Sequence, residues 1–169
     1  MEIEPITKQN LEICVDIIFE SELGRRYYPT RNLLKNKIEQ SYLEDSIYLA
    51  KDEGDSVGVL WYQRKGMFCQ YPYLHIIVLT ESCCGRGYGK KLMEFYEYNL
   101  AYVHKVMSLG TKLFLLVGDY NHAAKRFYEK LGYTEQGRIP HLFRRGITEI
   151  LMMKELRLSD VKNCEENPQ

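Results

Sequence analysis

The sequence has 169 residues, a length that suits one domain with a sizeable core. Lys and Arg number 23 and so do Asp and Glu, so no bulk basic charge points to a nucleic acid or a membrane surface. A hydrophobic content of 45% is ordinary for a globular protein, and no apolar run approaches the length of a membrane span. Any phosphate binding must therefore come from a local cluster of residues.

The amino terminus and the cysteines bear on the compartment. Met1–Pro5 is acidic and does not resemble a signal peptide. The five cysteines are odd in number and show no CxxC spacing, which favours free thiols in a reducing cytosol over disulfides or zinc. They are Cys14, Cys69, Cys83, Cys84 and Cys164. We therefore expect a cytoplasmic protein with no metal, no nucleic-acid partner and no membrane partner.

The first third of the chain predicts a strand over Glu2–Ile6 and then two helices. We expect Thr7 to cap the first helix and Gly24 to end it. Its apolar residues recur at roughly helical spacing: Leu11, Cys14, Ile17, Ile18 and Leu23. A connection rich in cations and aromatics, Arg25–Pro29, follows, and Thr30 is expected to cap the second helix.

Three strands are predicted next. Ser46–Ala50 and Val57–Tyr62 form an antiparallel pair around a tight turn at Glu53–Asp55. Lys65 and Gly66 are expected to turn the chain again. Tyr73–Leu79 is a nearly continuous apolar run, which is typical of a strand covered on both faces.

The stretch after Leu79 is the most informative part of the sequence. Gly85, Gly87 and Gly89 alternate with other residues, and glycine lets the backbone reach positive φ and approach a ligand closely. An amphipathic helix begins near Tyr88 and presents unpaired N–H groups at its start. Three cations add charge: Arg86, Lys90 and Lys91. The pattern indicates a phosphate site, with a glycine-rich turn bearing solvated cations as the alternative.

Two nucleotide motifs are excluded. A P-loop requires glycine where Cys84 stands, and Ser or Thr where Lys91 stands. The dinucleotide fingerprint requires a third glycine at the position of Leu92. The stretch is therefore neither of these motifs.

The last part predicts a helix–strand–helix–strand–strand order. The first helix carries an apolar stripe and is closed by Gly110; the stripe is Leu92, Phe95, Tyr96, Val103, Val106 and Met107. Lys112–Val117 reads as a buried strand, and Asn121 caps a second helix that Gly132 stops. The inward residues of that helix are Ala124, Phe127, Tyr128 and Leu131. Tyr133–Gly137 and Ile147–Met153 are the final strands, separated by Arg138–Gly146. The domain is expected over 1–156, with a loose tail over 157–169.

The resulting order, β-α-α-β-β-β-α-β-α-β-β, resembles the GNAT superfamily of acyl-CoA-dependent N-acetyltransferases. Cys84–Gly89 is similar to the family's Arg/Gln-x-x-Gly-x-Gly/Ala loop. Asn121–Tyr133 is similar to the family's Asn-x-x-Ala…Phe-Tyr…Leu-Gly-Phe segment. The resemblance implies a single-domain α/β fold with a mixed, mostly antiparallel sheet of about seven strands and about four helices.

The resemblance also implies roles for residues of this sequence, with acetyl-CoA as the co-substrate. The backbone of Ile77, Val78 and Leu79 would hold the pantetheine and the acetyl carbonyl. Loop amides would hold the pyrophosphate, at Gly85, Arg86, Gly87, Tyr88, Gly89 and Lys90. Asn121 would contact the cofactor, and Tyr128 would protonate the departing thiolate. Independently, an N–H aimed at a carbonyl oxygen stabilises an oxyanion, and a phenol is a suitable acid for a thiolate.

Two positions depart from the family pattern. Cys84 stands where Arg or Gln is preferred, from which we expect weaker pyrophosphate binding. Leu116 stands where many relatives that acetylate protein N-termini have Glu, which leaves the general base unassigned. His75 is a candidate because it is in phase with Ile77 and Leu79 and has a suitable pKa. An ordered water chain and Asp119 are its rivals, and a packed strand histidine is the plain alternative.

The resemblance places the amine acceptor near the loop between the first two helices and near the last strand pair. Aromatic and basic residues of those segments and of the strand before the loop are candidates for binding it: Tyr27, Tyr28, Tyr73 and His141. The alternative is that these are solvated loops whose aromatics cover the core edge. The expected function is transfer of acetyl from acetyl-CoA to a primary amine, small molecule or peptide, by direct attack in a ternary complex. A non-catalytic acyl-CoA-binding or regulatory module is the competing function, and a homodimer is left open.

Overall fold

A computed structural model describes residues 1–106 and 111–156, and the side chains of 102–106 are not described. Gly110, Met107, Cys164 and the tail expected over 157–169 therefore lie outside the described residues, as do the side chains of Val103 and Val106. The elements in chain order are β1 (Glu2–Pro5), α1 (Leu11–Glu20), α2 (Glu22–Tyr27), α3 (Arg31–Ser41), β2 (Ser46–Asp52), β3 (Asp55–Met67), β4 (Tyr71–Leu79), a 3₁₀ turn (Glu81–Cys83), α4 (Tyr88–Val106), β5 (Thr111–Gly118), α5 (His122–Lys130), β6 (Thr134–Pro140) and β7 (Thr148–Leu156).

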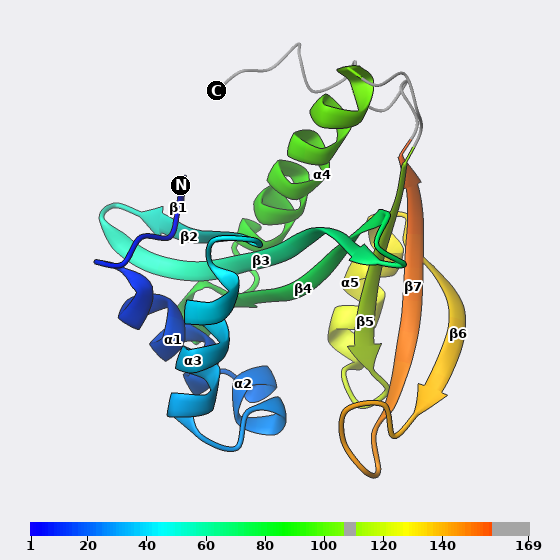
Figure 1. The fold of residues 1–169 in the computed structure, drawn as a ribbon, viewed down its shortest axis with the longest axis horizontal. Coiled ribbons are helices and arrows are strands. Elements are labelled where there is room, and N and C mark those ends of the chain that lie inside the picture. The colour runs from blue at the N-terminus through cyan, green and yellow to red at the C-terminus, as the bar shows by residue number, and fades with distance from the viewer. Residues whose placement is uncertain (107–110, 157–169) are drawn as a thin grey trace. The chain divides into compact units, whose positions relative to one another are not determined.

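The strands form one seven-stranded sheet in the order β1-β2-β3-β4-β5-β7-β6 (Figure 1). The pairs β1–β2, β2–β3, β5–β7 and β6–β7 are antiparallel. Only β4 and β5 pair in parallel among the described pairs, with Tyr73 opposite Phe114. A parallel pair needs a crossover connection, and α4 supplies it. The α/β class and the mixed, mostly antiparallel sheet are thereby confirmed.

The chain divides into two compact units. The first comprises Met1–Gln63 and His75–Glu94. Its core joins the apolar stripes of α1 and α3 to one face of the strands, as the fully buried Ile18, Leu34 and Trp61 illustrate. On the outer side of the two helices, Arg31 forms ion pairs with Glu12 and Asp16 at 2.7 and 2.6 Å. Exposed pairs of this kind contribute little to stability.

The second unit comprises Arg64–Leu74 and the chain from Phe95 onward. Inside it β5 and β7 pair along their whole lengths, with Leu115 opposite Met152. The two side chains are 1% and 0% exposed, as alternation in a strand with a core face requires. Helix α5 follows β5 in this unit (Figure 1). Its Tyr128 side chain is buried.

The structure corrects two predicted boundaries in the amino-terminal region. Thr7 does not cap α1, because its N–H donates to Asn10 Oδ1 at 2.6 Å and the helix begins only at Leu11. Gly24 does not end α1 either. It lies inside α2, a short helix that was not predicted and that brings the described α-helices to five where about four were expected. A Cβ at this position would stand 1.8 Å from the carbonyl oxygen of Ile18. Gly24 is therefore needed for close packing between the two helices. The cap predicted at Thr30 is confirmed, since its hydroxyl accepts from Leu33 N–H.

Two strand predictions are also wrong. Lys65 and Gly66 do not turn the chain, because β3 continues through them to Met67. The turn falls at Phe68 and Cys69, which adopt left-handed φ values of 54° and 55° without being glycines. Strand β4 is not covered equally on both faces. Its residues alternate between buried and partly exposed, and Tyr73 and His75 lie on the partly exposed face.

No described helix combines the length and apolar character that a membrane crossing needs. Among the described residues, no cluster of three or more His, Cys, Asp or Glu side chains is arranged to hold a metal ion. The four described cysteines are free thiols: Cys14, Cys69, Cys83 and Cys84.

Candidate functional site

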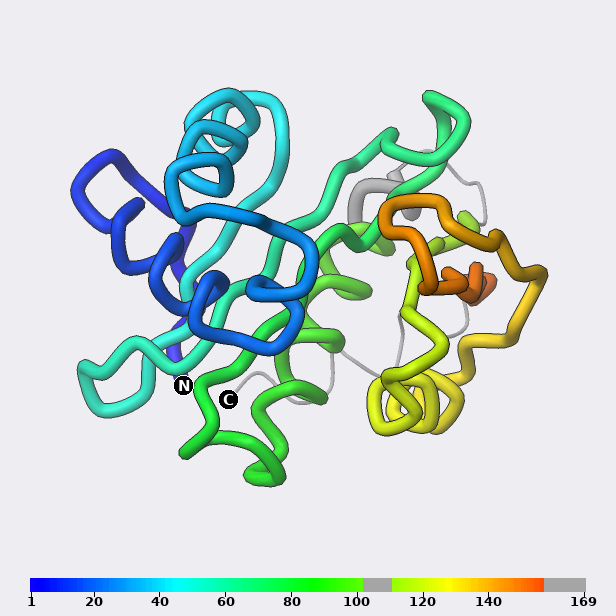
Figure 2. The backbone as a smooth tube through the Cα atoms, turned by 90° about the horizontal axis from the view of Figure 1, so that it is seen from below, coloured from blue at the N-terminus to red at the C-terminus, as the bar shows by residue number. Residues whose placement is uncertain are grey.

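The glycine-rich loop connects β4 to α4 within the first unit. Gly85 and Gly87 adopt φ values of 77° and 84°, in the left-handed region that glycine tolerates best. A Cβ at either position would meet no atom within 4 Å, so the loop is open on that side. Figure 2 shows the chain reversing direction there before α4 begins. The predicted positive φ is thus confirmed for these two glycines, whereas Gly89 is helical and does not adopt it.

The start of α4 carries the charges that a phosphate requires. Arg86 and Lys91 are exposed, and both lie over the ring of Tyr88, with distances to its centroid of 5.1 Å from the guanidinium carbon and 5.9 Å from Nζ. Lys90 instead pairs with Glu94 at 3.5 Å. The first N–H groups of a helix have no partner within it, and here they accompany full positive charges. The arrangement fits a pyrophosphate by the chemistry of its donors.

The adjacent cysteines differ from each other. Cys84 is exposed, and its thiol donates to the carbonyl oxygen of Thr80 at 3.6 Å. Cys83 is buried, and a hydrogen bond with the Thr80 side chain lowers its pKa.

The end of β4, where the backbone of Ile77, Val78 and Leu79 was expected to hold the acyl chain, approaches β3 closely. A Cβ at Gly58 of β3 would lie 2.7 Å from both the carbonyl oxygen of Val78 and Cδ2 of Leu79. Real Cβ atoms essentially never come so near another heavy atom, so only glycine fits there. Sequence reasoning did not single out Gly58; an isolated glycine inside a strand pattern was the available signal.

His75 lies in a polar and aromatic cluster of the first unit. Its Nε2 atom is 3.4 Å from the hydroxyl oxygen of Tyr28, and its ring stands edge-on to Trp61 with 4.5 Å between centroids. Trp61 Nε1–H donates to Asp45 at 2.7 Å, and Gln63 donates to the same carboxylate at 3.2 Å. Burial lowers the pKa of His75 to about 4, although Asp45 acts in the opposite direction. Burial also raises the pKa of Tyr28 to about 12.

Both partners of this contact are consequently neutral near pH 7. The structure brings together two predicted residues, Tyr28 and His75, and adds Trp61 and Asp45, which sequence reasoning missed. Tyr28 is the residue that follows α2, and Tyr27 is the last residue of that helix. The remaining predicted site residues belong to the second unit: Tyr73, Asn121, Tyr128 and His141.

In the second unit, Asn121 begins α5 as predicted. Its Oδ1 accepts a hydrogen bond from Ala124 N–H at 3.0 Å. Tyr128 follows on the buried side of the same helix and is 7% exposed. Its ring packs against Phe127 and Tyr133, with 5.3 and 5.9 Å between centroids. Burial raises its pKa, with a smaller contribution from Tyr73, so the phenol keeps its proton at any working pH.

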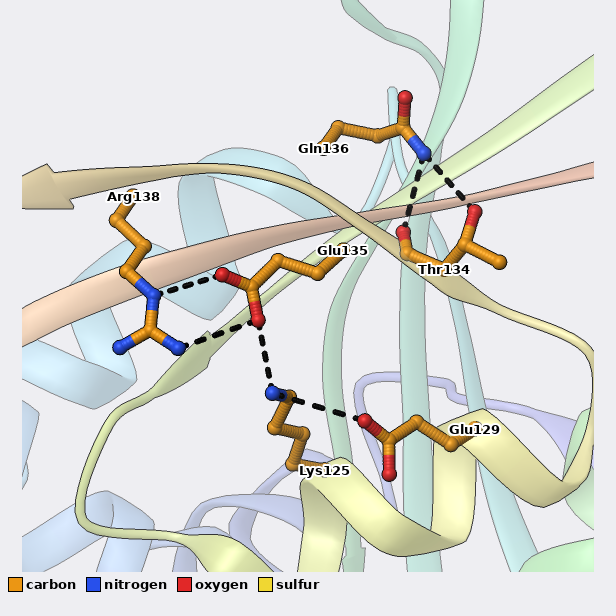
Figure 3. Close-up of polar contacts among 6 residues, drawn as sticks. All are labelled: Lys125, Glu129, Thr134, Glu135, Gln136 and Arg138. Carbon is orange, nitrogen blue, oxygen red and sulfur yellow. Dashed lines mark hydrogen bonds and ion pairs between the residues drawn. The ribbon is translucent and has the colours of Figure 1, made fainter.

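Ion pairs hold α5 to the edge strand β6 (Figure 3). Lys125 of the helix pairs with Glu135 of the strand at 2.8 Å, and Arg138 pairs with the same carboxylate at 2.7 Å. Lys125 also reaches Glu129 at 3.6 Å. Arg138 and then Lys125, through their hydrogen bonds, lower the pKa of Glu135 to about 2. This network fixes the helix that carries Asn121 and Tyr128.

The remaining candidates occupy loops. His141 is exposed at the end of β6, adopts a left-handed φ of 58°, and accepts a hydrogen bond at Nδ1 from Gly146 N–H at 2.9 Å. Its tautomer therefore carries the proton on Nε2 when the ring is neutral. Asp119 contributes a backbone N–H bond to Thr148, at 2.9 Å. Leu116 is partly buried in β5, opposite Leu151.

Comparisons with known proteins agree with this fold. Residues 44–135 match the family model described as acetyltransferase (GNAT) domain. The chain is similar to an uncharacterized N-acetyltransferase from Methanocaldococcus jannaschii, with 27% identity over 158 residues that make up 92% of each chain.

Solved structures resemble it in fold alone. One shows mutant forms of the spermidine/spermine N-acetyltransferase from Vibrio cholerae, with a TM-score of 0.69 and 16% identity over 96% of this chain and 98% of that one. Another is an aminoglycoside 6′-N-acetyltransferase complexed with coenzyme A, with a TM-score of 0.67 and 20% identity over 92% and 97% of the two chains.

Proposed function

The chain belongs to the GNAT family of acetyltransferases, and from that premise we propose that it transfers acetyl from acetyl-CoA to a primary amine. The observation that carries the proposal is the loop before α4. Gly85 and Gly87 take the backbone conformation that a closely bound phosphate needs, and Arg86 and Lys91 stand beside it. These residues fit the pyrophosphate of coenzyme A. The complex of one structural neighbour with coenzyme A supports the same choice.

We assign the acyl end of acetyl-CoA to the backbone of Ile77, Val78 and Leu79. Gly58 supports this assignment, because it lets β3 approach the end of β4 without a side chain between them. An N–H group in this segment that points to the thioester oxygen would stabilise the charge formed when the amine attacks. The attack is direct, from a complex that holds both substrates, so no acyl-enzyme forms.

The family pattern assigns Asn121 to the cofactor and Tyr128 to the departing thiolate. Tyr128 is a protonated phenol, as this role requires, while burial raises its pKa and so makes it a weaker acid than an exposed tyrosine. We assign proton acceptance to His75. Its low pKa keeps the imidazole neutral, and a neutral imidazole has a free nitrogen lone pair. Such a weak base suits an amine that reaches the site already uncharged.

For the acceptor we propose a primary amine. The candidates for binding it are Tyr27 and Tyr28 in the first unit and, separately, Tyr73 and His141 in the second. A polyamine or an aminoglycoside is a reasonable first test, since neighbours in fold carry those names. Leu116 disfavours protein N-termini as the acceptor, because the family resemblance implies Glu at this position in many relatives that acetylate them.

The test is a two-part measurement on the whole chain. Calorimetry reports acetyl-CoA binding, and thiol release reports turnover on a panel of amines, polyamines, aminoglycosides and peptides. Binding with turnover on at least one amine supports the proposal. Tight binding with no turnover on any acceptor would instead favour the non-catalytic acyl-CoA-binding module. Absence of acetyl-CoA binding would overturn both.

A further inference from the structure

The first position of the glycine-rich loop supplies no positive charge. Cys84 stands there, and its thiol is turned back to the carbonyl oxygen of Thr80, 3.6 Å away. Backbone amides can hold a phosphate, but they do not balance its full negative charge. The nearest cation in the loop is Arg86, between the two glycines of positive φ. Its side chain is exposed, and on a loop with no other contact it would sample many rotamers.

Tyr88, in the first turn of α4, restricts the motion of the Arg86 side chain. The ring is only 6% exposed, and its hydroxyl donates a hydrogen bond to Asp52 Oδ2 at the end of β2. This bond lowers the pKa of Asp52 and raises that of Tyr88, so the carboxylate stays charged and the phenol stays protonated. A ring that is buried and bonded at its far end is a fixed surface.

Two cations lie over this fixed ring, Arg86 at 5.1 Å and Lys91 at 5.9 Å. The face of an aromatic ring attracts a cation electrostatically. The Asp52 carboxylate also attracts Arg86, as its lowered pKa reflects. Both cations are thus held near the start of α4 before any ligand arrives, which reduces the entropy that binding must overcome.

We infer that Tyr88 and Asp52 are positioning residues for the binding of acetyl-CoA. They hold Arg86 and Lys91 near the start of α4, where these two cations balance the charge of the pyrophosphate. Cys84, at the first position of the loop, supplies no charge for this purpose. The inference rests on the proposed function and adds the source of the charge. A guanidinium presents several donors in one plane and can bind two phosphate oxygens at once, so Arg86 is the principal contact. All four residues lie in the first unit.

Calorimetric titration with coenzyme A tests the charge. Arg86→Gln should weaken binding about tenfold, the loss expected for one charge-assisted hydrogen bond. Lys65→Gln removes an exposed charge from β3 and should bind like wild type. Adding Cys84→Arg to the Arg86→Gln variant should restore most of the lost affinity. If wild type binds coenzyme A and Arg86→Gln binds it equally well, the inference is wrong while the proposed function stands. If wild type fails to bind, both fall.

A double-mutant cycle tests the positioning role. Tyr88→Leu keeps apolar bulk and removes the ring face, so it should weaken binding in the wild-type background and change little once Arg86 is Gln. Tyr88→Phe keeps the ring and removes only the hydrogen bond to Asp52, so it should lose less affinity for coenzyme A than Tyr88→Leu. The melting temperature of Tyr88→Phe checks that the fold survives. If the losses in binding free energy from Tyr88→Leu and Arg86→Gln were additive in the double variant, Tyr88 would not position Arg86.

Dephospho-coenzyme A identifies the phosphate. This probe lacks the 3′-phosphate and retains the pyrophosphate, so Arg86→Gln should weaken its binding by the same factor as for coenzyme A. A loss seen only with the 3′-phosphate present would overturn the assignment to the pyrophosphate.

Discussion

The hydroxyl oxygen of Tyr28 lies 3.4 Å from Nε2 of His75, between two groups that burial keeps uncharged. The contact joins the residue after α2 to the partly exposed face of β4. Protonation of the imidazole would place a positive charge in this buried environment, which burial disfavours. The stability of the protein is therefore linked to pH.

The first prediction concerns that linkage. In the unfolded chain, His75 has its ordinary pKa of 6.5 and takes up a proton below that pH. In the folded chain, burial lowers its pKa to about 4, so it stays unprotonated until the pH is near 4. The unfolded state then binds more protons, so stability should fall as the pH drops from 6.5 to 4. Melting temperatures measured across this window should decline less steeply for His75→Gln than for wild type. Parallel curves would show that the folded pKa of His75 is not lowered.

The second prediction concerns the rate profile. If His75 accepts the amine proton, His75→Ala should lower kcat/KM about a hundredfold, the usual scale for loss of a general base. In the pH profile of kcat/KM, the acid limb due to His75 should lie near pH 4 and not near neutrality. An acid limb near pH 6.5 in wild type that vanishes in the variant would contradict the lowered pKa. A profile and rate unchanged by the substitution would move the role to water, Asp119 or the amine itself.

The third prediction concerns Gly87. Valine at a φ of 84° is strained and would bring a branched side chain to the open side of the loop, so Gly87→Val should abolish coenzyme A binding. Gly54→Val is the matched control, because Gly54 has a φ of 91° and equally open surroundings in the β2–β3 turn. Calorimetry should find wild-type affinity in the control and none in Gly87→Val. Equal affinity in the two variants would mean that the loop does not hold the ligand.

The loop was predictable because its signals are local. Three glycines, a preceding apolar run and a following amphipathic pattern lie within a few residues of each other, and the structure realises positive φ at Gly85 and Gly87. Helical spacing in the same way predicted the buried position of Tyr128. Local backbone preference and periodicity thus covered the loop, the order of strands and helices along the chain, and the helix that carries Asn121.

What sequence reasoning missed depends on contacts between distant segments. Tyr88 meets Asp52 across 36 positions, and Trp61 meets Asp45 across 16. Such pairs form only after segments far apart in the sequence have come together in the fold, which a local pattern does not report. The turn at Phe68 was missed for a different reason, since a residue without glycine's freedom adopts a left-handed φ there.

The fourth prediction concerns Gly58. A Cβ added there would stand 2.7 Å from the carbonyl oxygen of Val78, a backbone atom that moves only with β4. Gly58→Ala should therefore destabilise the fold by about 1–3 kcal/mol, as overpacking does, and weaken acetyl-CoA binding. Gly137→Ala on β6 is the control, because nothing lies within 4 Å of its added Cβ. Denaturant unfolding and calorimetry measure both effects, and equal stability of the two variants would contradict the close approach of β3 and β4.

The last prediction separates enzyme from binding module. Tyr128→Phe keeps the buried ring and its packing against Phe127 and Tyr133, so the melting temperature and the affinity for acetyl-CoA should barely change. The hydroxyl is lost, and with it the acid that protonates the thiolate. Since a positioned acid contributes about 10²–10⁴ in rate, kcat should fall at least about tenfold.

Tyr133→Phe is the matched control for that experiment, because Tyr133 is another buried tyrosine in contact with the same ring, and its hydroxyl has no assigned part in the reaction. Steady-state rates should separate the two variants, with kcat lowered only in Tyr128→Phe. If Tyr128→Phe lost stability and activity in proportion, its hydroxyl would be a structural group. If kcat were unchanged while chemistry limited the rate, Tyr128 would have no part in the mechanism, and proton transfer to the thiolate would have to come from solvent.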